Sequence, residues 1–222
     1  MPGNSKSDHV KEVFTVISDK YDLLDSLISF GMDQKWRKAL VGKIPADTAL
    51  VVDCGAGTGK LTSLVLRHIN GKVNAIDLTE RMRRNPDPGR VNYQIGSAES
   101  LPFHDSTADC VVSAFLTRNL DSVRRYADEA YRVLKSGGRF LNLDIFNPTG
   151  WFAPFFAFYF FRIVPVFGDL VTRSKSYSYL AESVKNFVSR EGFSQILADA
   201  GFHSIKARPF ALGSVVLHEG FK

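Results

Sequence analysis

The chain has 222 residues, of which 45% are hydrophobic and 23% charged. This composition is that of an ordinary folded domain, and it excludes an intrinsically disordered chain. The formal net charge of +5 allows nucleic acid or anionic lipid as a partner but requires neither, since many basic globular proteins bind neither.

Residues 1–45 are predicted to form a helical extension at the N-terminus. The segment MPGNSKSDHVKE contains no apolar run, so we expect no secretory signal and a cytoplasmic location. Apolar residues then recur at helical spacing over 10–28. A second helix over 32–44 should end before Pro45.

Residues 46–146 alternate predicted strands and helices, which indicates a mostly parallel sheet covered on both faces. The strands are predicted at 48–54, 71–78, 91–98, 108–115 and 138–146. Helices are expected at 60–69 and 79–85. One face of a further helix is formed by Val123, Ala127, Ala130 and Leu134.

Residues 147–188 are predicted to form a helical insertion after the fifth strand, and 189–222 a C-terminal helix and hairpin. Strands at 205–212 and 214–220 fit an antiparallel edge on the parallel sheet. We therefore expect one α/β domain over 1–222, with a Rossmann-like sheet of seven strands.

The cysteines and histidines of the chain indicate no metal chemistry. Cys54 and Cys110 lie inside two predicted strands, so we expect buried free thiols in a reducing compartment. No cluster of Cys and His has the spacing of a metal site, so no metal is predicted.

Three glycines, Gly55, Gly57 and Gly59, follow the first strand of the core. Glycine at such a turn lets the backbone bend sharply and lets a ligand approach without a clash against Cβ. Lys60 is followed by Leu61 rather than Ser or Thr, so this is not a nucleoside triphosphate loop. The glycines alone would also suit a strand-to-helix turn that binds nothing.

Two carboxylates make the loop more specific. Asp77 lies 18 residues after Gly59, at the end of the second strand, where it can accept both hydroxyls of a ribose. Asp53, just before the glycines, suits a ligand with a cationic or amino group better than a pyrophosphate. S-adenosylmethionine has an amino acid end, a sulfonium and an adenosine. The arrangement around DCGAGTG thus resembles the cofactor site of the class I methyltransferases.

Longer segments resemble the ubiquinone/menaquinone biosynthesis C-methyltransferase family (UbiE-like). Residues 13–38 resemble its N-terminal signature, in which Tyr-Asp, Ser-x-Gly and Trp-Arg recur at these intervals. Residues 131–148, YRVLKSGGRFLNLDIFNP, resemble its second signature, and 176–187 and 217–222 match its C-terminal pattern. The likeness runs over nearly the whole chain.

This resemblance implies S-adenosylmethionine as the cofactor and a set of residues that contact it. Tyr21 and the glycine loop would hold the methionine end, Asp77 the ribose, and Ala98 with its neighbours the adenine. The full set is Tyr21, Asp53, Gly55, Ala56, Gly57, Asp77, Leu78, Ser97 and Ala98.

The resemblance also implies a lipophilic quinol as the methyl acceptor, with Arg118 and Asn119 matching an Arg-Asn pair at the rim of the active site. A ring carbon attacks a methyl group once a neighbouring hydroxyl loses its proton. A reduced ring has such a hydroxyl and an oxidised quinone does not. We expect Asp144, or a water held by Arg118 and Asn119, to assist this step. The alternatives are a strand-end cap for Asp144 and a surface ion pair for Arg118.

Three positions near the expected site depart from the family pattern. Ser97 stands in place of an acidic residue, Leu116 in place of glycine and Asp144 in place of glutamate. Leu116 and Asp144 border the presumed acceptor side, so another lipid or small molecule is the alternative substrate.

Two other functions stay open. An RNA or protein methyltransferase is favoured only by the basic charge, and no stripe of basic and aromatic residues suits nucleic acid, so none is expected. A non-catalytic, lipid-binding relative would have no need of both the glycine loop and Asp77.

Residues 151–171, WFAPFFAFYFFRIVPVFGDLV, form the most aromatic stretch of the chain. Pro154, Arg162, Pro165 and Asp169 interrupt it, so we expect no membrane span. Its aromatic residues are too many for one buried helix face. We expect a hydrophobic lid that contacts the membrane peripherally, with a homodimer interface or subdomain core as the alternative.

Overall fold

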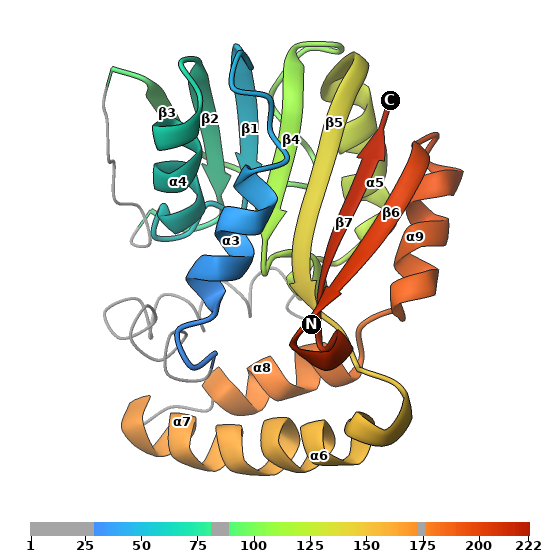
Figure 1. The fold of residues 1–222 in the computed structure, drawn as a ribbon. Coiled ribbons are helices and arrows are strands. Elements are labelled where there is room, and N and C mark those ends of the chain that lie inside the picture. The colour runs from blue at the N-terminus through green and yellow to red at the C-terminus, as the bar shows by residue number, and fades with distance from the viewer. Residues whose placement is uncertain (1–28, 81–88, 173–175) are drawn as a thin grey trace, which may run out of the picture.

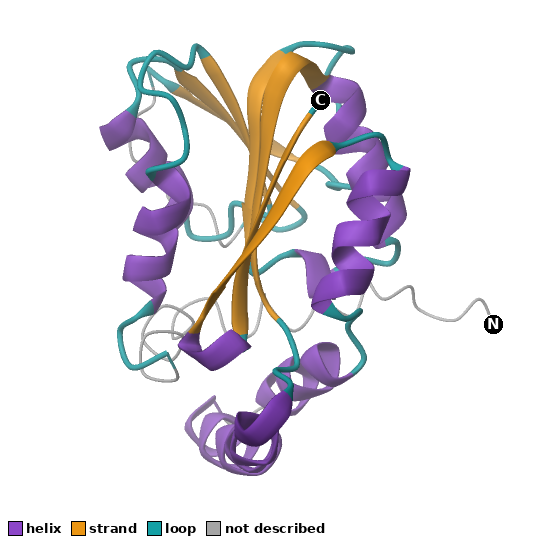
Figure 2. Ribbon diagram, turned by 45° about the vertical axis from the view of Figure 1, so that its right-hand side comes forward, coloured by secondary structure: helices purple, strands orange, loops and turns teal. Residues whose placement is uncertain are grey.

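The computed structural model describes residues 29–80, 89–172 and 176–222, which build a sheet with helices on both faces (Figures 1 and 2). Within this part of the chain the strands are β1 (Leu50–Cys54), β2 (Lys72–Asp77), β3 (Val91–Ile95), β4 (Ala108–Ala114), β5 (Leu134–Ile145), β6 (His203–Phe210) and β7 (Val215–Phe221). They form a seven-stranded sheet in the order β3-β2-β1-β4-β5-β7-β6.

Strands β1 to β5 pair in parallel, and β7 pairs antiparallel with both β5 and β6. This confirms the predicted fold class, including the antiparallel hairpin at the edge. The hairpin turns through a short 3₁₀ segment, η4 (Ala211–Gly213), close to the expected turn at Gly213.

The helices outside the insertion lie in two layers, one on each face of the sheet (Figure 2). One layer holds α3 (Asp33–Val41) and α4 (Lys60–His68), and the other α5 (Val123–Val133) and α9 (Arg190–Asp199). Neighbouring strand residues point to opposite faces, so Val51 packs with the first layer and Val52 with the second. Ser122 caps α5 and Ser189 caps α9 by accepting a backbone N–H with the side-chain hydroxyl.

Two predicted boundaries differ from the structure. Helix α5 ends at Val133, and Leu134, expected on the helix, is the first residue of β5. Leu134 pairs with Ala108. The register of β5 against β4 then shifts over Ser136, Gly137 and Gly138, and regular pairing resumes at Arg139. The helix expected at 10–28 and most of that at 79–85 lie outside the described residues.

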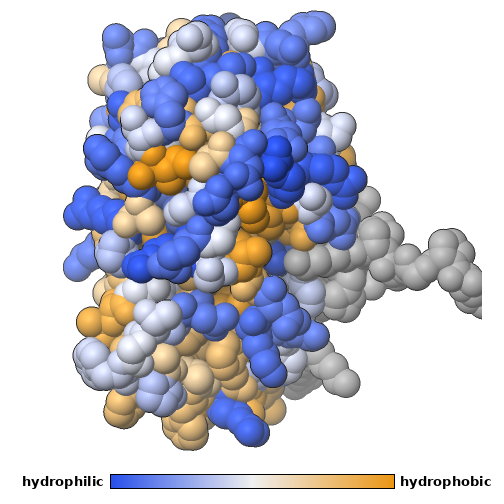
Figure 3. Space-filling model, turned by 90° about the vertical axis from the view of Figure 1, so that its right-hand side faces the viewer, coloured by the Kyte–Doolittle hydropathy of each residue, from blue (hydrophilic) through white to orange (hydrophobic). Residues whose placement is uncertain are grey.

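The insertion lies across the end of the sheet where β5 finishes (Figure 1). It runs through η2 (Gly150–Phe152), α6 (Ala153–Phe158), the π-helical turn η3 (Tyr159–Ile163) and α7 (Val164–Thr172), and returns along α8 (Ser176–Lys185). Its lower surface in Figure 3 is predominantly apolar.

The two prolines within residues 151–171 do not break the helical backbone. Pro154 lies in the first turn of α6, where its missing N–H is not needed. Pro165 follows the π-helical turn, which lets the chain continue past the lost hydrogen bond and the crowded carbonyl. Gly150–Leu170 is thus one helix, long and apolar enough to cross a membrane by length and composition. Of the 18-residue apolar window within this helix, 17% is buried.

Candidate active site

The loop between β1 and α4 is built by glycine. Gly55, Gly57 and Gly59 have φ values of 67°, 53° and 80°, in the left-handed region that side chains with a Cβ rarely adopt. The amides of Gly55 and Ala56 donate to the carbonyl of Ile76 at 2.8 and 3.0 Å, which ties the loop to the end of β2.

Asp77 fixes the same loop from the side of β2. Its Oδ2 accepts the Gly57 amide at 2.9 Å, and its Oδ1 accepts the amide and hydroxyl of Thr79 at 2.9 and 2.8 Å. The carboxylate is only partly buried and borders a cavity. Among the described residues Oδ2 accepts only the Gly57 hydrogen bond and retains acceptor capacity, so the predicted role in holding ribose hydroxyls stays compatible with the geometry.

The cavity opens at the carboxyl edge of the parallel strands and has an empty volume of about 860 Å³. This is the edge where open α/β sheets bind their ligands. Most of the predicted site residues line it, namely Gly55, Ala56, Gly57, Asp77, Leu78, Ser97, Ala98 and Asn119. The structure brings these predicted residues together around one cavity, and their contact with a cofactor stays a prediction. Tyr21 lies outside the described residues.

Asp53 does not line the cavity. Its side chain is buried under the loop, where Oδ2 accepts the Thr62 hydroxyl of α4 at 2.6 Å. Burial raises the pKa of Asp53 to about 7, and the Thr62 hydrogen bond opposes the rise. Asp53 therefore ties the end of β1 to α4 and does not face the cavity.

Arg118 and Asp144 form a buried ion pair behind the cavity wall. Arg118 Nη1 lies 2.6 Å from Asp144 Oδ1, and both side chains are at most 2% exposed. The carboxylate also accepts the Thr117 hydroxyl at 2.7 Å and the Ile145 amide at 2.8 Å. A proton-accepting role for Asp144 does not fit this arrangement, because its oxygens are occupied by donors and do not line the cavity.

The ion pair holds an unusual piece of backbone. Phe115, the first residue after β4, has a φ of 64°, which costs energy for a residue with a Cβ. Its amide donates to Leu143 O at 2.7 Å, and its carbonyl accepts Arg118 Nη1 at 2.8 Å. Arg118 therefore fixes the start of the 3₁₀ segment η1 (Thr117–Asn119) and acts on the site through position.

Asn119 ends η1 and lines the cavity with a buried side chain. Its Nδ2 donates to Phe115 O at 3.4 Å, while Oδ1 has no hydrogen-bond partner among the described residues. A buried amide oxygen without a partner is costly, so this wall of the cavity favours a ligand that donates a hydrogen bond.

Leu116 also lines the cavity and packs on the glycine loop. A Cβ added at Gly55 would lie 2.7 Å from Leu116 Cδ1, so the two residues are in close contact. Leu116 therefore fills space beside the loop.

The cavity-lining residues that sequence reasoning missed include Arg37, Lys60 and Phe115. Arg37 Nη1 lies 2.7 Å from Asp33 Oδ2, and its guanidinium lies 4.8 Å from the centre of the Phe115 ring. The available signal was the Trp36-Arg37 pair in the N-terminal signature. Its contact with Phe115 depends on how α3 packs, which the sequence does not show.

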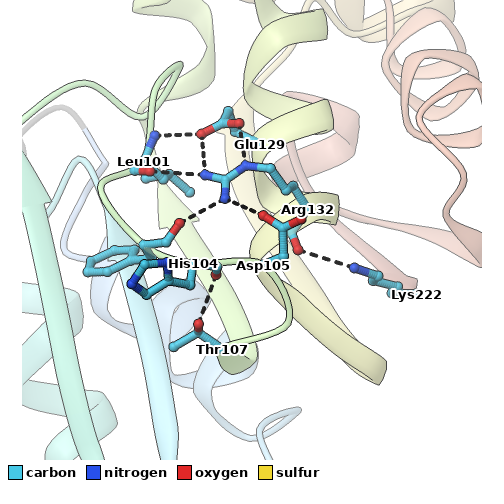
Figure 4. Close-up of polar contacts among 8 residues, drawn as sticks. Leu101, His104, Asp105, Thr107, Glu129, Arg132 and Lys222 are labelled. Atoms are coloured by element: carbon cyan, nitrogen blue, oxygen red, sulfur yellow. Dashed lines mark hydrogen bonds and ion pairs between the residues drawn. The ribbon is translucent and has the colours of Figure 1, made fainter.

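The loop after β3, which carries Ser97 and Ala98, is held to α5 by Arg132 (Figure 4). The guanidinium donates to the carbonyls of Leu101 and Phe103 at 3.0 and 2.8 Å. Glu129 accepts from Arg132 and from the Leu101 amide at 2.7 Å. These contacts fix the side of the cavity where the adenine is expected.

The strand order, the glycine loop and the carboxylate at the end of β2 define the fold of the class I S-adenosylmethionine-dependent methyltransferases. Such a methyltransferase from Thermotoga maritima has a TM-score of 0.69 at 20% identity, over 95% of this chain and 99% of that one. Phosphoethanolamine N-methyltransferase 2 from Haemonchus contortus, solved with S-adenosyl-L-methionine, has a TM-score of 0.64 at 14% identity, over 85% of this chain and 52% of that one.

The sequence narrows the class to one family. The ubiE/COQ5 methyltransferase family profile matches residues 3–222. A Rickettsia akari relative is 31% identical over 98% of this chain and 94% of its own length. A Cereibacter sphaeroides relative is 34% identical over 100% of this chain and 94% of its own length. Both are named ubiquinone/menaquinone biosynthesis C-methyltransferase UbiE. The chain belongs to the ubiE/COQ5 family and is an S-adenosylmethionine-dependent methyltransferase.

Proposed function

We propose that this enzyme methylates a ring carbon of a polyprenylated quinol of the demethylmenaquinol type, in respiratory quinone biosynthesis. The names of its relatives support the substrate class. The observation that carries the proposal is the cavity at the carboxyl edge, where the glycine loop, Asp77 and Asn119 converge.

The cavity residues fit S-adenosylmethionine. The glycine loop offers a surface without side chains, Asp77 offers acceptors for ribose hydroxyls, and Ser97 and Ala98 border the adenine side. Arg37 and Lys60 place positive charge where a carboxylate can be held. When bound, the cofactor supplies a methyl group that its sulfonium has already activated.

The protein's part in the reaction is to orient the acceptor ring. Asn119, the rim residue with an unpartnered buried oxygen, is placed to accept a hydrogen bond from the acceptor ring. Arg118 and Asp144 keep η1, and with it Asn119, in position. Water at the open cavity takes the hydroxyl proton, since Asp144 is enclosed.

The test is methyl transfer from labelled cofactor to matched reduced and oxidised quinones, each with and without a prenyl tail. We expect label in the reduced ring alone. Equal labelling of the oxidised quinone would show that hydroxyl activation is not part of the reaction. In a whole membrane lipid extract, label in another lipid class would assign a different acceptor, as Leu116 would suggest. In a parallel incubation with total RNA, label in the RNA would remove the quinol altogether.

Asn119→Ala tests the residue assigned to the acceptor. We expect turnover to fall about 10–100-fold, as for the loss of one oriented polar group in an active site. Asn92→Ala is the matched control, because Asn92 is exposed on β3 and does not line the cavity. Equal turnover in both variants would remove Asn119 from the site.

A further inference from the structure

The insertion has two apolar sides, and within the described part of the chain only one of them is buried. Phe156, Phe160 and Val164 pack with Tyr177 and Val184 of α8. The other side is exposed to between 64% and 73% and consists of Trp151, Phe155, Phe158, Val166, Phe167 and Leu170. An exposed apolar row along a whole helix marks an interaction surface.

We propose that this row lies in the surface of a lipid bilayer, with the helix parallel to the membrane plane. Tryptophan and phenylalanine are favoured at the boundary between headgroups and acyl chains. Gly150–Leu170 is long enough to present the row over about 30 Å at 1.5 Å per residue. The helix is therefore a docking surface for lipid.

The charges of the same helix fit an anionic headgroup layer. Arg162 is exposed, and its long stem lets the guanidinium reach phosphate while the helix stays in the interface. The carboxylate of Asp169 faces inward, where it accepts the Tyr177 amide at 2.7 Å and the Ser178 hydroxyl at the start of α8. The outward side thus offers a cation, while the helix's one carboxylate is engaged.

The packing against α8 favours a helix in the membrane surface over one that spans it. A Cβ at Gly168 would lie 2.3 Å from the Tyr177 ring, so α7 and α8 are in close contact. Asn147 Nδ2 donates to Val184 O at 3.0 Å and ties the end of α8 to the exit of β5. A spanning helix would have to break these contacts.

The proposed substrate favours a bilayer over a second copy of this chain as the occupant of the exposed row. This step rests on the proposed function. A polyprenyl tail is soluble in the membrane and not in water. Helix α8 packs against η1, which carries Asn119 at the cavity wall. The insertion therefore connects the membrane surface to the active site, and the quinol ring would reach the cavity while its tail stays in lipid.

The test uses the full-length enzyme and vesicles of mixed phosphatidylcholine and phosphatidylglycerol, without substrate. Wild type should sediment with the vesicles, and Phe155→Ser/Phe158→Ser should bind at least about tenfold more weakly. Ile95→Ser, which removes an exposed apolar side chain from β3, is the matched control and should bind like wild type. Unchanged sedimentation of the double variant would overturn the proposal.

Trp151 provides a second readout, because the chain has two tryptophans and Trp36 is buried in the core. Brominated lipids should quench the emission of wild type and not that of Trp151→Phe. Absence of quenching would overturn the proposal. So would light scattering that shows a dimer in wild type and a monomer in the double variant, since a second copy would then occupy the row.

Activity separates this proposal from the proposed function. The double variant should retain turnover on a tail-less, water-soluble hydroquinone and lose turnover on quinol embedded in vesicles. If wild type binds vesicles but methylates neither quinol, the substrate assignment fails and the docking surface stands. If wild type methylates both quinols but stays out of the vesicle pellet, the docking surface fails and the function stands.

Discussion

At the carboxyl edge of the sheet, carboxylates that are buried or partly buried hold the cavity wall, whereas in the insertion aromatic packing holds one helix against another. Asp53, Asp77 and Asp144 each bind neighbouring hydroxyls or amides within about 3 Å. Phe156 and Phe160 stack with ring centres 5.0 Å apart and make no directional polar contact with each other. One region is fixed by hydrogen-bond geometry, and the other by apolar area.

This difference predicts how each region responds to mutation. A buried carboxylate that loses its partner leaves a charge without compensation, so changes at the cavity wall should be costly. The outer side of the insertion has no packed partner within the described protein, so changes there should leave folding unaltered.

Asp144→Ala should destabilise the protein by about 3–5 kcal/mol, because it leaves the buried Arg118 guanidinium without its counter-ion. Chemical denaturation measures the loss. Asp128→Ala is the matched control: it removes an Arg124–Asp128 pair whose side chains are 51% and 48% exposed. That change should cost at most about 1 kcal/mol. A similar cost for both variants would show that Asp144 does not hold the cavity wall.

Asp53→Asn should stabilise the protein by about 2–4 kcal/mol above neutral pH and by little at about pH 4 and below. The folded pKa of Asp53 is about 7, against an ordinary 3.8. The folded state therefore retains a proton that the unfolded chain releases, and wild type loses this stability as pH rises from about 4 to about 7.

Denaturation of Asp53→Asn and wild type at several pH values measures the difference between them. Burial lowers the pKa of His218 to about 4, which makes stability rise with pH over part of the same range. That contribution is present in both proteins and cancels in the difference. A difference independent of pH would contradict a buried, neutral Asp53.

Local sequence patterns made the fold and part of the cavity predictable. The glycine loop, Asp77 and the strand order follow from alternating apolar runs and from residues adjacent in sequence. The Arg118–Asp144 pair was not predictable, because it joins residues 26 apart through the register of β4 and β5. The left-handed backbone of Phe115 depends on those tertiary contacts. The π-helical turn before Pro165 depends on the helix continuing past the proline. Residue types alone specify neither.

Asp77→Ala should weaken S-adenosylmethionine binding by about tenfold or more, since hydrogen bonds to a charged group contribute about 1.5–3 kcal/mol. Calorimetry measures the affinity. Asp109→Ala is the matched control, because Asp109 also accepts two backbone amides, those of Ala49 and Leu50, but at the other end of the strands. It should bind the cofactor like wild type. Equal affinities for both variants would remove Asp77 from the cofactor site.

Phe155→Ser/Phe158→Ser should change the free energy of unfolding by no more than about 0.5 kcal/mol, because both side chains are mostly exposed in the folded protein. Phe156→Ala, one residue away, removes a buried ring that stacks on Phe160 and should loosen the whole insertion. Hydrogen exchange over residues 150–185 measures this directly. Fast exchange in Phe156→Ala with wild-type exchange in the double variant would show that the two apolar sides of one helix have separate roles. Equal loss of protection in both would mean that the outer row is part of the fold, and the contrast between the two regions would then be wrong.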